Sequence, residues 1–231
     1  MRIIALTFIL STLSIVPLLA DFYPPTVERS VVNIKKKSVT LNQGFPTKGM
    51  SGVVIHNYGD DLAAITSYLR YEGGKRATSI SNEPITHNEL PTVKSKVHSR
   101  DKVIGGYLYK NILLLAPDAN TYAKIIASAN KNWIHPDLFA MFLAQEGDQF
   151  PNKENLKKFA NEYQIGLIYI VQRGKAKLYD PISQRYVAQK SLAGLPAKGK
   201  FPFYMRLGKI EASWFSREAN GSYYKLMGNI R

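Results

Sequence analysis

Residues 102–118 read KVIGGYLYKNILLLAPD, and every residue from 112 to 116 is apolar. A strand without polar alternation is usually covered on both faces, as in a sheet with helices packed on it. The glycines earlier in the stretch add a hairpin signal. This segment therefore predicts a buried strand, and neighbouring parts of the chain must supply its cover.

Helices are expected on the C-terminal side of this strand, over residues 118–130, 136–146 and 151–164. Asp118 is suited to cap the first helix, because its side chain can accept a hydrogen bond from an unpaired backbone N–H. In the stretch WIHPDLFAMFLAQEGD, residues 133–148, Pro136 is suited to begin a helix and Gly147 to end it. Further strands are expected over residues 166–174, 175–179 and 185–190. This order predicts an α/β unit with helices packed on a sheet.

The N-terminal side carries β-sheet patterns instead. Residues 51–81 place the pair Gly73 and Gly74 between two alternating runs, which predicts a hairpin with Glu72 facing Lys75 and Leu69 facing Thr78. Residues 27–42 predict two strands, or one strand with a charged interruption. Short strands with Gly-rich turns favour a small barrel or a strongly curved sheet.

The expected fold class is therefore α+β: a small β-barrel or curved antiparallel sheet, followed by an α/β unit. The expected organisation is a signal peptide over 1–20, an N-terminal extension with strands over 21–47, a β-rich subdomain over 48–117, an α/β subdomain over 118–207 and a tail over 208–231.

Residues 1–20 have the pattern of a signal peptide, since Arg2 precedes an almost wholly apolar run and Ala20 ends a cleavage region. An uncleaved anchor is the alternative, because Leu18 is a poor match to the small residue expected there. The sequence contains no cysteine, which leaves neither a disulfide nor a lipoprotein attachment site. We expect export to the periplasm and a fold that relies on its core.

The sequence is strongly basic, with 31 Lys and Arg against 17 Asp and Glu and a net charge of +14. For an exported protein this excess favours anionic partners such as lipid head groups, cell-wall polymers or acidic protein faces, and not nucleic acid. The alternative is that the lysines are simply solvated.

The stretch 133–148 also holds the densest group of polar residues that could bind a metal or act in catalysis. On a helix, Asp137 and Glu146 lie roughly 13 Å apart along the axis, so they cannot share one metal ion with His135 unaided. We therefore assign these residues to building the helix.

The remaining candidates for catalysis are weak. His56, His87 and His98 are isolated in β or loop contexts, and Asp60 and Asp61 have the setting of a loop. The sequence has no Cys nucleophile, G-x-S-x-G elbow, phosphate loop or dinucleotide fingerprint. We expect no catalytic residue, no metal and no cofactor, and a binding or structural protein in place of an enzyme. An envelope hydrolase would require a polar cluster that only folding could assemble.

Four blocks of the sequence carry a resemblance to a known family: KGMSGVVIHNYG (48–59), ELPTVKSKVHSRDKVIGGYLYKNILLLAPDANTY (89–122), WIHPDLFAMFL (133–143) and GLIYIVQRGKAKLYD (166–180). Their order and spacing resemble the N-terminal domain of the PgbA family of plasminogen-binding proteins from spiral Gram-negative bacteria. The resemblance extends from about Lys48 to Ile210.

The resemblance implies a domain type and suggests partners. Family members similar to the founder carry a Lys/Glu-rich tail and a terminal lysine, which plasminogen kringles capture, whereas this sequence ends at Ile230 and Arg231. We therefore expect only weak, charge-driven contact with plasminogen. The first hypothesis is a periplasmic structural or adaptor protein that binds envelope proteins, by lineage analogy a subunit of the scaffold or disk of the polar flagellar motor. The second is a surface-exposed plasminogen-binding protein.

Two groups of residues are candidates for docking a partner. Large amphipathic rings dominate interface energies, which favours the aromatic residues Trp133, Trp214 and Phe215. Trp133 has an alternative role as a hydrophobic staple before the helix that follows it. The segment 194–216 likewise either wraps the domain and buries its aromatic rings or offers them to a partner. Electrostatic docking is expected at Lys35, Lys36 and Lys37.

Overall fold

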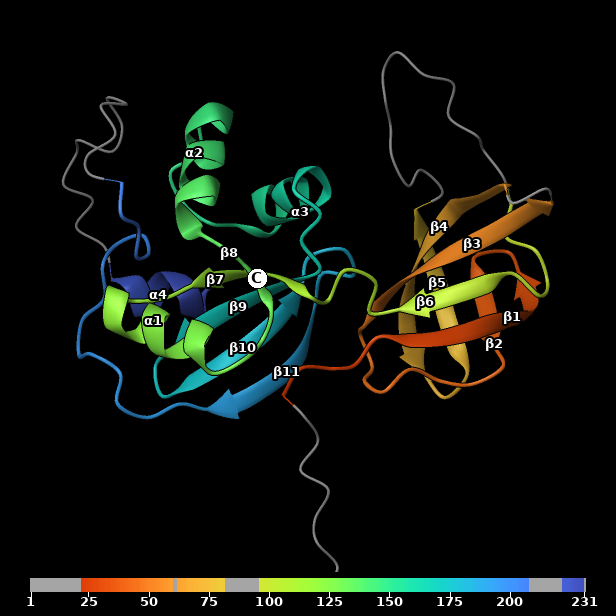
Figure 1. Ribbon diagram of the computed structural model, residues 1–231, viewed down its shortest axis with the longest axis horizontal. Coiled ribbons are helices and arrows are strands. Elements are labelled where there is room, and N and C mark those ends of the chain that lie inside the picture. Colours follow the sequence, from red (N-terminus) through yellow and green to blue (C-terminus); the bar gives the residue numbers. More distant parts are fainter. Residues whose placement is uncertain (1–21, 60–61, 82–95, 208–221, 231) are drawn as a thin grey trace, which may run out of the picture.

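The computed structural model describes residues 22–59, 62–81, 96–207 and 222–230. Figure 1 shows two units side by side, a barrel formed by the N-terminal part and a sheet with helices formed by the C-terminal part. This architecture confirms the predicted α+β class. Among the residues described, no helix has both the length and the apolar character needed to cross a membrane.

Six antiparallel strands close the barrel in the order β1-β2-β5-β4-β3-β6. Their bounds are β1 Val27–Lys35, β2 Ser38–Leu41, β3 Ser51–Gly59, β4 Leu62–Gly73, β5 Arg76–Ser81 and β6 Lys102–Gly105. The interior is apolar, with Val31, Leu41, Val54, Leu69 and Val103 almost fully buried. Closure pairs both edges of every strand, so the barrel leaves no free sheet edge.

The Phe45 ring covers the place where β3 and β6 meet. Gly52 of β3 pairs with Gly105 of β6, and a Cβ atom on Gly105 would lie only 2.8 Å from the Phe45 ring. Glycine at this position therefore lets the aromatic ring approach the backbone closely.

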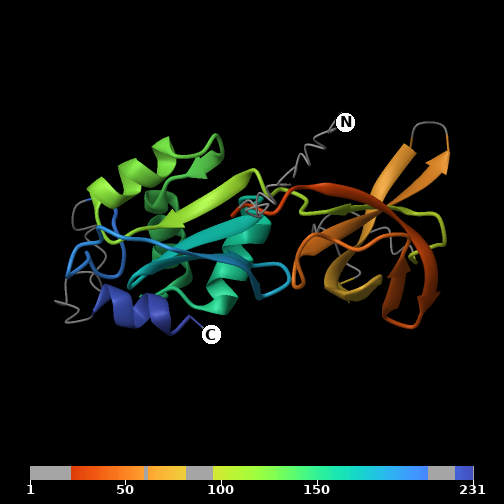
Figure 2. The ribbon, with the colours of Figure 1, turned by 90° about the horizontal axis from the view of Figure 1, so that it is seen from below.

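The second unit is a five-stranded sheet in the order β11-β10-β9-β7-β8. Its elements are β7 Asn111–Leu115, α1 Ala119–Ala127, β8 Asn132–Ile134, α2 Pro136–Glu146, α3 Lys153–Glu162, β9 Leu167–Gln172, β10 Lys175–Asp180, β11 Arg185–Ser191 and α4 Tyr223–Gly228. β7 runs parallel to both neighbours, and such pairs need crossover helices. Figure 2 shows α1 on one side of the sheet and α3 and α4 on the other. Residues 112–116 are fully buried, which confirms the cover expected for them.

Local capping residues set the ends of the first three helices. The Asp118 side chain accepts a hydrogen bond from Thr121 N at 2.7 Å and begins α1. Pro136 is the first residue of α2, and Gly147 ends that helix at φ 72°. Asn152 and Asn155 exchange hydrogen bonds at the start of α3. The caps at Asp118, Pro136 and Gly147 are the ones that the sequence predicts.

The C-terminal part of the chain wraps the sheet. Phe203 is almost fully buried, and the described part of segment 194–216 thus follows the wrapping alternative. The Tyr223 hydroxyl of α4 lies 2.8 Å from the backbone oxygens of both Leu115 and Val171 and shares its single proton between them. The Gln172 side chain donates to Met227 O at 2.7 Å. This helix, which the sequence does not predict, belongs to the core.

A buried carboxylate joins the two units. Asp180, at the end of β10, is fully buried, and its Oδ2 accepts hydrogen bonds from Ser51 N of the barrel at 2.7 Å and from the Tyr109 hydroxyl at 2.6 Å. Its Oδ1 accepts from Ile182 N at 3.0 Å and Ser183 N at 2.9 Å. Burial raises the pKa of Asp180, and hydrogen bonds from Ser183, Tyr109 and Ser51 partly offset that rise by favouring the ionised form.

The structure corrects the strand pairing expected for residues 102–118. The hairpin signal there is wrong, because β6 already pairs with β1 and β3 on its two edges, and β7 lies in the other sheet. Residues 106–110 are instead the link between the units, with Gly106 at φ 69° and Leu108 at φ 66° turning the chain. The β-rich unit therefore includes β1 and β2 and ends before β7, which differs from the expected boundaries at 47 and 117.

The β4–β5 hairpin also differs in register from the expected one. Gly73 pairs with Arg76, so the turn residues are Gly74 and Lys75 and not Gly73 and Gly74. Beyond a bulge between Tyr71 and Gly73, Leu69 pairs with Ser79 and not with Thr78. Glu72 consequently does not face Lys75 as predicted. Residues 27–42 form two strands, the first of the two alternatives.

We expect Asp180→Ala to lower the free energy of unfolding by roughly 3–5 kcal/mol, because it leaves several buried donors without an acceptor. Tyr109→Phe should cost about 1–3 kcal/mol, since it removes one of the four donors. Urea denaturation of the purified protein measures both effects. Glu28→Ala is the matched control, as its ion pair with Lys102 is exposed and such pairs contribute less than about 1 kcal/mol. Equal losses for Asp180→Ala and Glu28→Ala would contradict the proposed role of the carboxylate.

Candidate functional site

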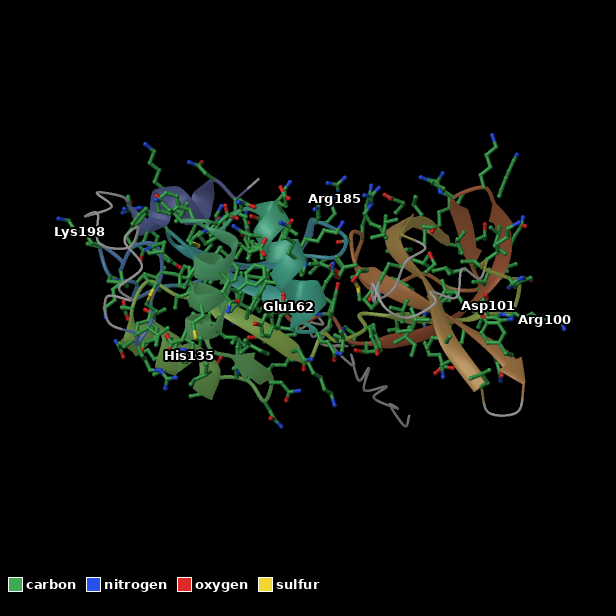
Figure 3. All side chains as sticks on the ribbon, turned by 90° about the horizontal axis from the view of Figure 1, so that it is seen from above. Arg100, Asp101, His135, Glu162, Arg185 and Lys198 are labelled. Atoms are coloured by element: carbon green, nitrogen blue, oxygen red, sulfur yellow. The ribbon has the colours of Figure 1, made fainter. Side chains whose placement is uncertain are left out.

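The end of the barrel that points away from the second unit is the outer end. β3 begins at Ser51, which bonds to Asp180 at the junction, and runs outward to Gly59, roughly 26 Å away at the usual strand rise. Figure 3 shows Arg100 and Asp101 at this end, far from His135 and Glu162 of the second unit. Large apolar side chains are exposed on the barrel at Val32, Tyr58 and Leu62, by 53%, 42% and 63%.

A turn of three lysines adds positive charge to the same unit. Lys35, Lys36 and Lys37 are all exposed and connect β1 to β2. Lys36 adopts φ 56°, a left-handed conformation that costs a side-chain-bearing residue about 1–2 kcal/mol relative to the right-handed one. Glycine or asparagine would adopt this turn more readily, so local folding alone does not favour lysine here.

The described segment 97–101 lies against β1 and connects the exposed positions. Ser99 Oγ donates to Val32 O at 3.1 Å, and Arg100 N donates to Val31 O at 2.8 Å. Asp101 is buried, and its Oδ2 accepts a hydrogen bond from His98 N at 2.7 Å. This bond closes the turn that leads into β6. The segment therefore presents Arg100 and His98 beside Val32.

Two histidines and an aspartate meet at the outer end. His56 Nδ1 of β3 lies 2.6 Å from Asp101 Oδ1, and the His56 and His98 rings are 4.5 Å apart between centroids. The His56 and Tyr58 rings make a T-shaped contact, with 4.6 Å between their centroids. One potential ligand atom from each of His56, His98 and Asp101 can be chosen so that all three lie within 4.8 Å of one another. Imidazole and carboxylate groups at this separation have the chemistry of a divalent-metal site.

The interpretation of His56 and His98 as isolated residues is therefore wrong. They lie far apart in the chain, and no spacing rule for a single helix or loop links them. The sequence does show locally that His98 and Asp101 are three residues apart before a strand. This spacing is common in turns that a hydrogen bond between a side chain and the backbone closes. Only the pairing of β3 with β6 adds His56.

The polar residues of the stretch 133–148 build the helix, as their spacing suggested. His135 is the N-cap of α2, and its Nδ1 lies 3.1 Å from Asp137 N. Asp137 accepts hydrogen bonds from Arg206 N at 2.8 Å and Arg206 Nε at 3.1 Å, which ties the C-terminal wrap to α2. Glu146 pairs instead with Lys158 at 2.9 Å. The three residues do not converge on one site.

Trp133 is only partly exposed in the structure. Its ring packs edge-on against Tyr23 and Tyr169, and its Nε1 donates to Ala129 O at 3.1 Å. It is thus part of the packing of β8, and docking of a partner at the exposed part of its ring stays a prediction. Trp214, Phe215, His87, Asp60 and Asp61 lie outside the described residues, and docking at Trp214 and Phe215 stays a prediction.

Comparison with known proteins identifies one family over most of the chain. The family described as "Plasminogen-binding protein pgbA N-terminal" matches residues 26–227. This range contains both the barrel and the sheet unit, so the match covers all the described strands and most of the described helices.

Two curated relatives are similar over part of their length. The plasminogen-binding protein PgbA of Helicobacter pylori strain J99 is 28% identical over 146 residues, which cover 62% of this chain and 32% of that protein. The protein of the same name from strain 26695 is also 28% identical over 146 residues, covering 62% and 31%. The match thus spans about one third of the relatives. No solved structure matches the chain significantly.

We expect the stability of α2 to depend on the protonation of His135. Burial lowers the pKa of His135 below 6.5, although the Asp137 charge opposes this, and the neutral ring can accept the hydrogen bond from Asp137 N. Because the unfolded chain then binds the proton more readily, the free energy of unfolding should fall as pH falls through the range below 6.5.

His135→Asn keeps a side-chain cap but removes the titrating ring. Urea denaturation across a pH series should therefore show a shallower loss of stability on acidification in this variant than in the unchanged protein. Identical slopes for the two proteins would exclude this role of His135.

Proposed function

The chain belongs to the PgbA N-terminal family, and on that premise we propose that it is a non-enzymatic protein-binding domain. Its docking surface is the outer end of the barrel, and its preferred partner is an acidic face of another protein. The second unit serves as the support that holds the barrel in place through Asp180.

The observation that carries this proposal is the mixture of side chains at the outer end. Exposed apolar groups at Val32, Tyr58 and Leu62 accompany the exposed cations of Lys35, Lys36 and Lys37. Apolar anchors with charged surroundings are the usual composition of a protein interface, and like charge on one partner favours the opposite charge on the other. The unfavourable backbone of Lys36 also supports a role for the lysine turn beyond local folding.

The structural roles of the other polar residues also agree with a binding function. Asp180, Asp137 and Glu146 each have hydrogen-bonded or ion-paired partners that hold elements of the fold together. These contacts account for their chemistry without a substrate. The proposal therefore assigns function to association and not to catalysis.

The proposal extends to the compartment and the class of partner. The signal-peptide pattern of residues 1–20 supports export, and we place the protein in the periplasm as a structural or adaptor protein. The partners are envelope proteins, with components of the flagellar motor among them. Its positive charge also favours weak contact with an anionic membrane or cell wall.

Lysine-dependent capture of plasminogen is the second candidate function. The relatives are named as plasminogen-binding proteins, and the exposed side chains of Lys35, Lys36 and Lys37 are available to a lysine-binding module. If this second function is correct, the lysine analogue 6-aminohexanoic acid displaces bound plasminogen from the protein.

Reversing the charge of the lysine turn tests the docking surface. We expect the triple variant Lys35→Glu, Lys36→Glu and Lys37→Glu to reduce cross-linking to envelope partners at least about tenfold in living cells, because electrostatic attraction speeds association and selects the partner. A C-terminal tag, chemical cross-linking and quantitative mass spectrometry measure the yield of each partner.

The control variant makes the same change in net charge on the second unit, with Lys124→Glu, Lys157→Glu and Lys198→Glu at exposed positions. It should leave the cross-linking yield near that of the unchanged protein. If the yield of cross-linked partners falls equally in both variants, the effect depends on net charge alone, and the proposed docking surface is contradicted. Recovery of outer-surface proteins alone, with plasminogen displaced by the lysine analogue, supports the second candidate.

A further inference from the structure

We propose that His56, His98 and Asp101 bind a divalent transition-metal ion of the zinc class at the outer end of the barrel. The three side chains come from two separate parts of the chain, β3 and the segment before β6, which strand pairing brings together. The inference does not depend on the identity of any protein partner.

The separations are close to those around a single ion. Zinc binds imidazole nitrogen and carboxylate oxygen at about 2.0–2.2 Å, so two ligands of a tetrahedral site lie about 3.4 Å apart. The candidate ligand atoms here lie within 4.8 Å of one another, and His56 Nδ1 is 2.6 Å from Asp101 Oδ1. Small rotations of the side chains are therefore sufficient: the His98 ring moves inward while His56 and Asp101 separate slightly.

The surroundings hold two of the ligands in place. Asp101 is buried and its second oxygen accepts a hydrogen bond from His98 N, while the Tyr58 ring packs on the His56 ring in a T-shaped contact. His98 is exposed, and among the described residues its one ring contact is with His56, so its ring has room to turn. A site with two positioned ligands and one adjustable ligand loses little conformational freedom on binding.

Metal binding replaces the hydrogen bond between His56 and Asp101. The ion binds His56 Nδ1 and a carboxylate oxygen of Asp101, so the proton between these two atoms passes to solvent. Nε2 takes up or keeps a proton, and His56 therefore binds as a neutral imidazole. Three protein ligands leave a coordination position open toward the exposed side of His98, where water or a side chain of a partner completes the site.

The ligand set selects the class of metal. Imidazole nitrogen is preferred by zinc, nickel and copper, whereas magnesium and calcium prefer sites made of oxygen atoms. The competing explanation is that His56 and Asp101 form only a structural hydrogen bond that steadies the turn at residues 98–101. That explanation requires no metal and gives His98 no role as a ligand.

Zinc binding to the full-length purified protein distinguishes the two explanations. The protein is prepared without a polyhistidine tag, dialysed against a chelator and titrated with zinc chloride in competition with a zinc-sensitive dye. His98→Ala removes an exposed ligand at little risk to folding. His98→Cys supplies a thiolate, another good zinc ligand, in a chain that has no other cysteine. His135→Asn removes a histidine outside the cluster and keeps the helix cap.

We expect one zinc ion per chain, at least about tenfold weaker binding in His98→Ala, recovery in His98→Cys and no change in His135→Asn. Magnesium and calcium should not compete. The proposal is overturned if zinc fails to bind, or if His98→Ala binds it as well as the unchanged protein, since binding is then adventitious. Circular dichroism confirms that each variant is folded.

Discussion

The buried carboxylate of Asp180 is the constraint on which the arrangement of the two units depends. A carboxylate removed from water is costly unless donors satisfy its oxygens. Here the donors come from β3 of the barrel, from the link at Tyr109 and from the turn after β10. The N–H and O–H groups of these three segments reach the Asp180 oxygens together only when the barrel and the sheet have this relative position. The carboxylate therefore fixes the start of β3 against the sheet and directs the outer end of the barrel away from it.

Local physical chemistry made much of the fold predictable. Asp118 caps α1, Pro136 begins α2 and Gly147 ends it, all through local backbone preferences and contacts, so the sequence alone identifies them. The apolar run 112–116 likewise identifies a strand that helices must cover. The errors concern strand pairing. β6 pairs with β1 and β3, of which β1 lies far away in the sequence, and the turn of the β4–β5 hairpin lies one residue later than expected, at Gly74 and Lys75.

The same distinction separates the predictable from the unpredictable parts of the site. The lysine turn is visible as three successive residues, and its exposure follows from its charge. The cluster of His56, His98 and Asp101 is not visible, because His56 joins the other two only through the pairing of β3 with β6. Conversely, Trp133 is a docking candidate by residue type, but part of its ring packs against Tyr23 and Tyr169. How much of the Trp133 ring is exposed to a partner depends on these tertiary contacts, which the sequence does not show.

The central claim is that the outer end of the barrel is the binding surface of this PgbA N-terminal domain. Site-specific photo-cross-linking in living cells tests it directly, with the photoreactive residue placed at Tyr58 or at Met141 of α2, which are 42% and 48% exposed. The account predicts a discrete cross-linked partner from position 58 and none from position 141. A partner captured from position 141 alone would contradict it.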